Sequence, residues 1–363
     1  MKVLFITSND FGELSLATFF ARNQPFQSIF VVPKKRATYF DEVVDIKYVY
    51  SSITELERII ENEKPDVISL NTGYLIVNGG LATMEEFQLF YEYLKKLGCP
   101  IITTDPFVRV YDSYPECSFE LDGNPLVSLK NEMTFLSEYL KELPHIYGFP
   151  CKSNLENAYL FYNDKYCLKE KKPQHDTEKK DHWLFVLGEL DSTLLFVKHG
   201  ELFIKELAER LKEICQNTEN RVRCVFPENI ANMLRVPLAP LKNLQILNFL
   251  TLEEFETLVS ESDIVFYWNV FSNSILMCYY YDVPFLCFGK GHIADLSEDL
   301  FNHMSDGIYR SGKPEFIDFL SPLEPNLDTL LEKQYSKENR RRILDEYHRL
   351  PTPQSIVKAL TND

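Results

Sequence analysis

The chain has 363 residues, 45% of them hydrophobic and 25% charged, which is the balance of a soluble globular protein with about two domains. Its formal net charge of −16 repels phosphate backbones and excludes a general nucleic-acid binder. There is no run of about 18 apolar residues and no Cys pair at metal or redox spacing, so we expect no transmembrane segment and a reducing, cytoplasmic location.

Strands alternate with helices from the start of the chain. The strands are expected at 3–7, 28–32, 45–50, 66–71, 99–105 and 159–162, and the helices at 13–23, 54–63, 84–97 and 131–143. Thr54, with Glu57 three residues later, has a capping-box pattern, and Gly98 fits the residue after a helix. This alternation predicts parallel β-α units with helices on both faces of a sheet.

The alternation restarts after a charged segment, 169–182, which contains Pro173 and lacks apolar periodicity and is therefore interpreted as a linker. Further strands are expected at 183–187, 221–226, 244–247, 264–268 and 284–288, and helices at 200–216, 252–260 and 274–281. The fold class is α/β. We expect an N-terminal domain at 1–168, a C-terminal domain at 183–335 and a helical tail at 336–363 that can cross back.

Four motifs follow one another in the second half, at Phe249–Phe255, Glu261–Val265, Ser272–Ser274 and Asp282–Leu286. They indicate a helix start, a buried strand, a small-residue loop that opens a helix, and a strand entered through Val-Pro. In this order they resemble the nucleotide-sugar domain of GT-B glycosyltransferases. The resemblance implies two Rossmann-like, doubly wound domains facing across a cleft, with the donor held mainly by the second domain and no metal required.

Ser272, Asn273 and Ser274 are the first candidates for donor binding. They lie beyond the carboxyl end of a predicted strand, where doubly wound sheets bind ligands, and at a predicted helix N-terminus, where free amides favour a diphosphate. Such residues also cap helices with no ligand present, so ordinary capping is an equal alternative.

Two more loops are candidates for the donor side. Gly188, Ser192 and Thr193 follow the first strand of the second half, and in the resembling enzymes that loop faces the donor phosphates. Lys290 and His292 follow the Val-Pro strand, where a cation or imidazole could neutralise a leaving diphosphate. The alternatives are a plain turn for the first loop and solvated side chains for the second.

Asp10, Glu13 and Asp105 are the candidates for acid–base chemistry. Asp10 and Glu13 flank the turn after the first strand, where the resembling inverting enzymes often keep the base that deprotonates the acceptor. Asp105 ends a later strand and is the second choice. A carboxylate can act as a base where its surroundings raise its pKa, although acids in a first helical turn are also common without function.

The resulting hypothesis is a glycosyltransferase that moves a sugar from a nucleotide-diphosphate donor, such as a UDP-sugar, to a small molecule, glycan or protein. The donor is a co-substrate, and the scattered His residues suggest no metal site. A sugar-nucleotide epimerase or hydrolase with paired acids is the alternative. A non-catalytic binding protein is a third, because Met277 and Asp282 replace a Glu and a Gly of the resembling families.

Overall fold

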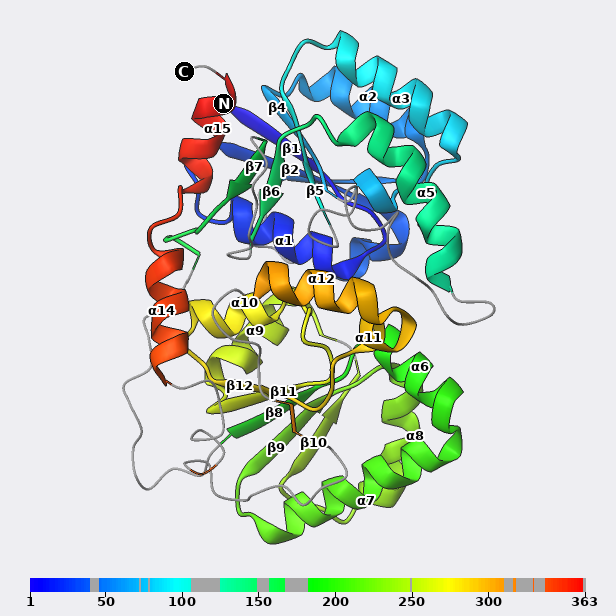
Figure 1. Cartoon of the computed structure of the whole chain (residues 1–363), viewed down its shortest axis with the longest axis vertical. Coiled ribbons are helices and arrows are strands. Elements are labelled where there is room, and N and C mark those ends of the chain that lie inside the picture. The colour runs from blue at the N-terminus through cyan, green and yellow to red at the C-terminus, as the bar shows by residue number, and fades with distance from the viewer. Residues whose placement is uncertain are drawn as a thin grey trace. The chain divides into compact units, whose positions relative to one another are not determined.

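A computed structural model describes the chain in two compact units (Figure 1). The described residues are 1–39, 46–71, 73–77, 79–105, 125–148, 157–166, 182–248, 250–309, 316–317, 329 and 337–361. Unit 1 comprises Met1–Leu168, Leu296–Arg310 and Ile343–Asp363, and unit 2 comprises Lys169–Asp295 and Ser311–Arg342. The predicted linker lies outside the described residues, except for its last residue, His182, which begins a strand.

Unit 1 is built on a parallel sheet of seven strands in the order β3-β2-β1-β4-β5-β6-β7. The strands are β1 (Lys2–Ile6), β2 (Gln27–Pro33), β3 (Ile46–Tyr50), β4 (Val67–Leu70), β5 (Ile101–Thr104), β6 (His145–Tyr147) and β7 (Ala158–Leu160). The strand order reverses direction between β1 and β4, which makes this pair the topological switch point of the sheet.

Helices cover both faces of this sheet because right-handed crossovers change face where the strand order reverses (Figure 1). The helices of unit 1 are α1 (Phe11–Ala21), α2 (Ile53–Glu63), α3 (Met84–Lys96), α5 (Pro125–Leu140) and α15 (Pro353–Thr361), with short 3₁₀ turns at η1 (Lys34–Tyr39) and η2 (Gly73–Leu75). Helix α12 (Glu298–Ile308) also belongs to this unit. Helix α14 (Lys337–Tyr347) begins in the residues of unit 2 and ends in those of unit 1.

The helix ends of unit 1 correct one sequence prediction and confirm another. Ser52, not Thr54, caps α2, because its side chain accepts a hydrogen bond from the Glu55 amide at 3.3 Å. Gly98 has φ +72°, the left-handed conformation expected of a glycine after a helix, and so confirms that prediction. At the centre of the sheet the Phe5 ring lies 5.0 Å from Phe30, in a fully buried core.

Unit 2 is a smaller parallel sheet in the order β10-β9-β8-β11-β12, with its switch point between β8 and β11. The strands are β8 (His182–Val186), β9 (Arg221–Val225), β10 (Leu244–Leu247), β11 (Ile264–Tyr267) and β12 (Phe285–Cys287). The helices are α6 (Glu189–His199), α7 (Glu201–Asn217), α8 (Glu228–Leu238), α9 (Leu252–Glu261), α10 (Ile275–Tyr280) and α11 (His292–Leu296).

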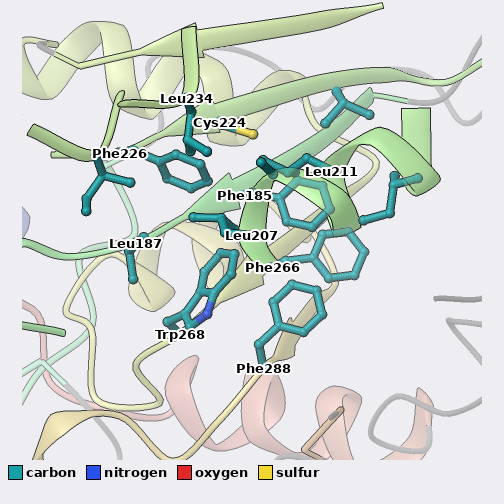
Figure 2. Close-up of a cluster of buried hydrophobic side chains, with 14 of the residues drawn as sticks. Phe185, Leu187, Leu207, Leu211, Cys224, Phe226, Leu234, Phe266, Trp268 and Phe288 are labelled. Carbon is teal, nitrogen blue, oxygen red and sulfur yellow. The ribbon is translucent and has the colours of Figure 1, made fainter. Parts of the chain in front are cut away.

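Aromatic rings from three neighbouring strands form the core beneath the candidate donor loops (Figure 2). Phe185 stacks on Phe266 with centroids 4.5 Å apart, and Phe266 stacks on Phe288 at 5.3 Å. Trp268 packs 4.9 Å from Phe288. Because Trp268 and Phe288 directly precede the loops after β11 and β12, this packed layer fixes where both loops begin.

Candidate functional site

Three carboxyl side chains gather at the carboxyl edge of the unit 1 sheet. Asp10 and Glu13 lie at the start of α1, directly after β1, and Asp105 follows the last residue of β5. The charges of both aspartates act on Glu13, and Thr104 Oγ1 donates a hydrogen bond to Glu13 Oε2 at 2.5 Å. The structure therefore brings together the three residues that the sequence suggested for acid–base chemistry.

Glu13 is the most perturbed of these groups, because its side chain is only 3% exposed. Burial raises the pKa of Glu13 to about 8; the charge of Asp10 and, less strongly, that of Asp105 act in the same direction, against the Thr104 hydrogen bond. At neutral pH Glu13 therefore carries a proton. It can give a proton or hold one, and it is a poor base below pH 8.

Asp10 is exposed and serves as the N-cap of α1. Its Oδ1 accepts hydrogen bonds from the backbone N–H of Gly12 at 2.7 Å and of Glu13 at 3.3 Å. Asp10 therefore has the helix-start role that the sequence offered as the alternative to catalysis. The backbone amides of α1 and the dipole of that helix hold its carboxylate.

Asp105 is 7% exposed and is held from β6. Tyr147, the last residue of β6, donates its phenolic hydrogen bond to Asp105 Oδ2 at 3.0 Å. Next to it, His145 contacts Tyr74 through Nε2 at 2.9 Å and the Leu143 carbonyl through Nδ1 at 2.7 Å. Burial lowers the pKa of His145, so a neutral ring that donates from Nδ1 and accepts at Nε2 fits both contacts.

The sequence did not indicate a role for Tyr147, because β6 is too short to show the alternation of buried and exposed residues that marks a strand. Three residues, His-Ile-Tyr, give no alternation that separates a buried strand from a loop. Only the pairing of Thr104 with Ile146 puts Tyr147 next to Asp105.

In unit 2, the loop after β8 is shorter than expected. Helix α6 begins at Glu189, so Gly188 is its N-cap and Ser192 and Thr193 lie within it. Both hydroxyls donate to the Glu189 carbonyl at 2.8 Å, and Ser192 is only 1% exposed. A Cβ at Gly188 would lie 2.9 Å from Asp191 Oδ2, so this helix start already holds a buried carboxylate of its own.

The loop after β11 keeps small polar side chains together. Ser272 Oγ lies 2.8 Å from Ser274 Oγ, both half-buried, and Asn273 lies between them in the chain. Asn269 Oδ1 accepts the Phe271 amide hydrogen bond at 2.9 Å, which closes the turn. Helix α10 has only six residues and Ser274 makes no side-chain cap, so these hydroxyls, more than a long helix dipole, characterise the loop.

The loop after β12 approaches the loop after β11. Gly291 has φ +87°, and a Cβ there would lie 2.8 Å from Asn269 Oδ1 and 3.1 Å from Asn269 Cα. Lys290, directly before it, is exposed, and His292 begins α11. The structure thus brings the Lys290–His292 segment to the Ser272–Ser274 loop, through a glycine that nothing larger can replace without movement.

The two departures from the resembling families have different structural meanings. Met277 is fully buried in α10. Asp282 adopts φ +57°, a left-handed conformation in which glycine is free of strain and Asp is tolerated. The family glycine is therefore explained by backbone geometry at this turn, and Asp282 satisfies the same geometry.

No protein-family model matches the chain, and no curated protein matches it in sequence. Solved structures match over nearly its whole length. The glycosyltransferase SnogD from Streptomyces nogalater has a TM-score of 0.56 at 13% identity, over 100% of this chain and 99% of that chain. The MnaA–UDP structure from S. aureus has a TM-score of 0.54 at 13% identity, over 97% and 92%.

A UDP-GlcNAc 2-epimerase from Neisseria meningitidis bound to UDP-GlcNAc gives a TM-score of 0.51 at 13% identity, over 100% of this chain and 98% of that chain. At such identities the likeness concerns the fold. The chain has the GT-B fold, with two parallel sheets of seven and five strands covered by helices, which confirms the predicted α/β class with two Rossmann-like sheets. No described helix is long and apolar enough to cross a membrane.

Proposed function

We propose that the chain is a glycosyltransferase that takes a sugar from a nucleoside diphosphate, with the donor on unit 2 and the acid–base groups on unit 1. The observation that carries the proposal is the group of three carboxyls at the carboxyl edge of the unit 1 sheet, in a chain with the GT-B fold. Structures of this fold that hold UDP or UDP-GlcNAc support a UDP-sugar as the donor.

The donor diphosphate is assigned to the loops after β11 and β12. Ser272, Ser274 and the amides around Asn273 offer hydrogen-bond donors, and Lys290 offers a positive charge for the leaving diphosphate. His292 joins them at the start of α11. Metal ions are not needed in this proposal, because the amides and Lys290 carry the charge stabilisation.

The loop after β8 takes a smaller part in the proposal. Gly188 stays a candidate for backbone contact with the donor. Ser192 and Thr193, whose hydroxyls are bonded to the Glu189 carbonyl, are better explained as stabilising α6. The buried Asp191 carboxylate would also repel a phosphate placed at this helix start.

Asp105 is the acid–base residue that the geometry favours. It is held at 3.0 Å by Tyr147 of β6, whereas Asp10 Oδ1 is held by the backbone amides at the start of α1. Glu13 is assigned to hold a proton beside Asp105 rather than to accept the proton of the acceptor, since it is already protonated at neutral pH.

A thermal-shift screen with UDP, GDP, dTDP, CMP and ADP tests the donor site. We expect UDP to raise the melting temperature and the double variant Ser274→Ala, Lys290→Ala to lose most of that shift. Ser260→Ala is the matched control, because Ser260 is a half-buried Ser of the same unit whose hydroxyl donates only to the Thr257 carbonyl. An equal UDP shift in the double variant and the wild type would contradict the assignment.

A sugar-nucleotide epimerase or hydrolase is the second candidate, and the protonated Glu13 favours it. An acid with its proton beside two further carboxyls supplies more proton-transfer groups than a transferase with one base needs. Incubation with UDP-sugars and no acceptor separates the two enzymes, because only the epimerase or hydrolase then changes the sugar nucleotide. If no nucleotide shifts the melting temperature, the non-catalytic alternative replaces both.

A further inference from the structure

β10 is the last strand at one edge of the unit 2 sheet. It pairs in parallel with β9, with Leu244 opposite Val222, and the Val222 amide donates to the Asn243 carbonyl at 2.8 Å. In a parallel pair, the N–H and C=O groups of one residue both point to one side of the strand, and those of the next residue both point to the other side. Leu244 and Ile246 therefore direct their N–H and C=O groups away from β9, where no strand of the described residues pairs with them.

At other sheet edges, neighbouring segments of the chain form hydrogen bonds at or next to the edge strand. At the β12 edge, the Ile317 amide donates to the Cys287 carbonyl at 2.8 Å. Next to β7, the Tyr162 amide donates to the Pro351 carbonyl at 3.1 Å. β10 reads Leu-Gln-Ile-Leu, with neither a charge nor such a cover in the described chain.

Helix α8 packs beside β10 and exposes an apolar side. Leu234 of α8 lies in the core cluster that Figure 2 shows. Leu238 belongs to the same cluster, and Leu244 packs against it. On the outer side Val236 is 83% exposed and Met233 is 46% exposed. Val236 is the most exposed of the large apolar side chains in the part of the chain that the structure describes.

The surface around this edge also differs in charge from the rest of the chain. Residues 229–252 contain no Asp or Glu and two cations, Arg235 and Lys242. The whole chain has 54 acidic residues, so a segment of this length would carry about four at average density. By contrast, Leu89, which is 71% exposed, lies on α3 one turn from Glu85 and Glu92.

We infer that the β10–α8 edge docks a second copy of this chain. Two copies with a net charge of −16 repel each other, and this segment lets them approach without opposing carboxylates. Antiparallel pairing about a twofold axis at Gln245 sets Leu244 of one copy opposite Ile246 of the other, which satisfies the outward N–H and C=O groups of both and joins the two sheets.

A lipid surface suits this edge less well than a strand does. An apolar phase would leave the outward backbone groups of Leu244 and Ile246 without hydrogen-bond partners, at a cost of several kcal/mol per group. A strand of the same sequence supplies a donor and an acceptor for each.

Sedimentation of the full chain across a range of micromolar concentrations tests the inference without donor or acceptor, so its outcome is separate from that of the proposed function. We expect a reversible dimer whose dissociation constant rises at least about tenfold in Gln245→Glu, since Gln245 is exposed on β10 and the two new carboxylates would face each other at the twofold axis. Val197→Glu, at a 77% exposed position on α6, is the matched control and should dimerise like the wild type. A monomer at every concentration, or equal dissociation constants for wild type and Gln245→Glu, overturns the inference.

Amide hydrogen exchange tests the strand pairing itself. The amides of Leu244 and Ile246 should exchange more slowly as protein concentration rises, while the Gln245 amide, which faces β9, should not respond. A dimer in which Leu244 and Ile246 stay unprotected contradicts pairing through this edge. A monomer that sediments with phosphatidylglycerol vesicles and loses this in Val236→Glu would replace the second copy with a lipid surface.

Discussion

At the scale of single residues, the buried carboxyl of Glu13 links the unit 1 site to the stability of the fold. Its pKa is about 8 in the folded chain, against an ordinary value of 4.5. Between these two pH values the folded chain keeps a proton that the unfolded chain has released. Stability from this group is therefore fully present below pH 4.5, falls as pH rises, and is lost above pH 8.

Glu13→Gln should remove that dependence, because the amide has the shape of the protonated acid and no proton to lose. In urea unfolding at pH 5, 6.5 and 8, the wild type should lose on the order of 1 kcal/mol per pH unit relative to the variant. Glu85→Gln, at an exposed position of α3, should keep the wild-type slope. Parallel slopes for Glu13→Gln and wild type would show that Glu13 is ionised in the folded chain.

Tyr147 is expected to position Asp105 for the proposed reaction. Tyr147→Phe removes the hydrogen bond to Asp105 Oδ2, so we expect kcat to fall by roughly 10- to 100-fold with little change in the KM of the donor, and Asp105→Asn to cost about 10²- to 10⁴-fold. Tyr48→Phe is the control, because its hydroxyl bonds Glu63 away from this edge. Unchanged kinetics in Asp105→Asn would move the acid–base role to another residue.

At the scale of elements, the contact of Gly291 with Asn269 joins the loops after β12 and β11. Gly291→Ala adds a Cβ 2.8 Å from Asn269 Oδ1 at a φ of +87°, so the loops must move apart. We expect a loss of about 1–3 kcal/mol in unfolding free energy and a smaller thermal shift with UDP. Gly289→Ala is the matched control, because nothing lies within 4 Å of its Cβ position. Equal losses in both variants would contradict this account.

The elements that the sequence predicted well are those with a clear period. The alternating apolar runs of β1, β2, β4, β8 and β11 and the amphipathic pattern of α3 and α7 predict the two parallel sheets, which the structure confirms. Helix α8 was missed because Pro227 precedes it and Pro237 lies within its last turn, and both read as breaks. Helix α6 was read as a loop because Gly188 precedes a polar segment.

The candidate site was predictable to the same degree. Asp10, Glu13 and Asp105 could be grouped because the carboxyl ends of parallel strands meet at one edge. The environment of each residue could not be predicted. The burial of Glu13 and the hydrogen bond from Tyr147 to Asp105 both depend on how α1, β5 and β6 pack together. The donor-side residues remain predictions, with Ser192 now better explained as part of α6.

At the scale of the whole molecule, the last residues of the chain belong to unit 1. The Tyr347 hydroxyl donates to the Gly148 carbonyl at 2.7 Å, and the Tyr162 amide donates to the Pro351 carbonyl at 3.1 Å. Val357 of α15 is fully buried. Residues separated by about two hundred positions in sequence thus complete one unit, and we expect the C-terminal segment to contribute to the stability of unit 1.

Val357→Ala tests this dependence without removing the segment. The lost packing and the cavity should cost unit 1 roughly 1–3 kcal/mol, whereas Val197→Ala, at an exposed position, should cost little. Both tryptophans, Trp183 and Trp268, lie in unit 2, so their fluorescence follows that unit alone while circular dichroism follows both. We expect Val357→Ala to lower the dichroism midpoint and leave the fluorescence midpoint in place. A shift of the fluorescence midpoint by the same amount would mean that the chain unfolds as one cooperative body, with the C-terminal segment stabilising all of it.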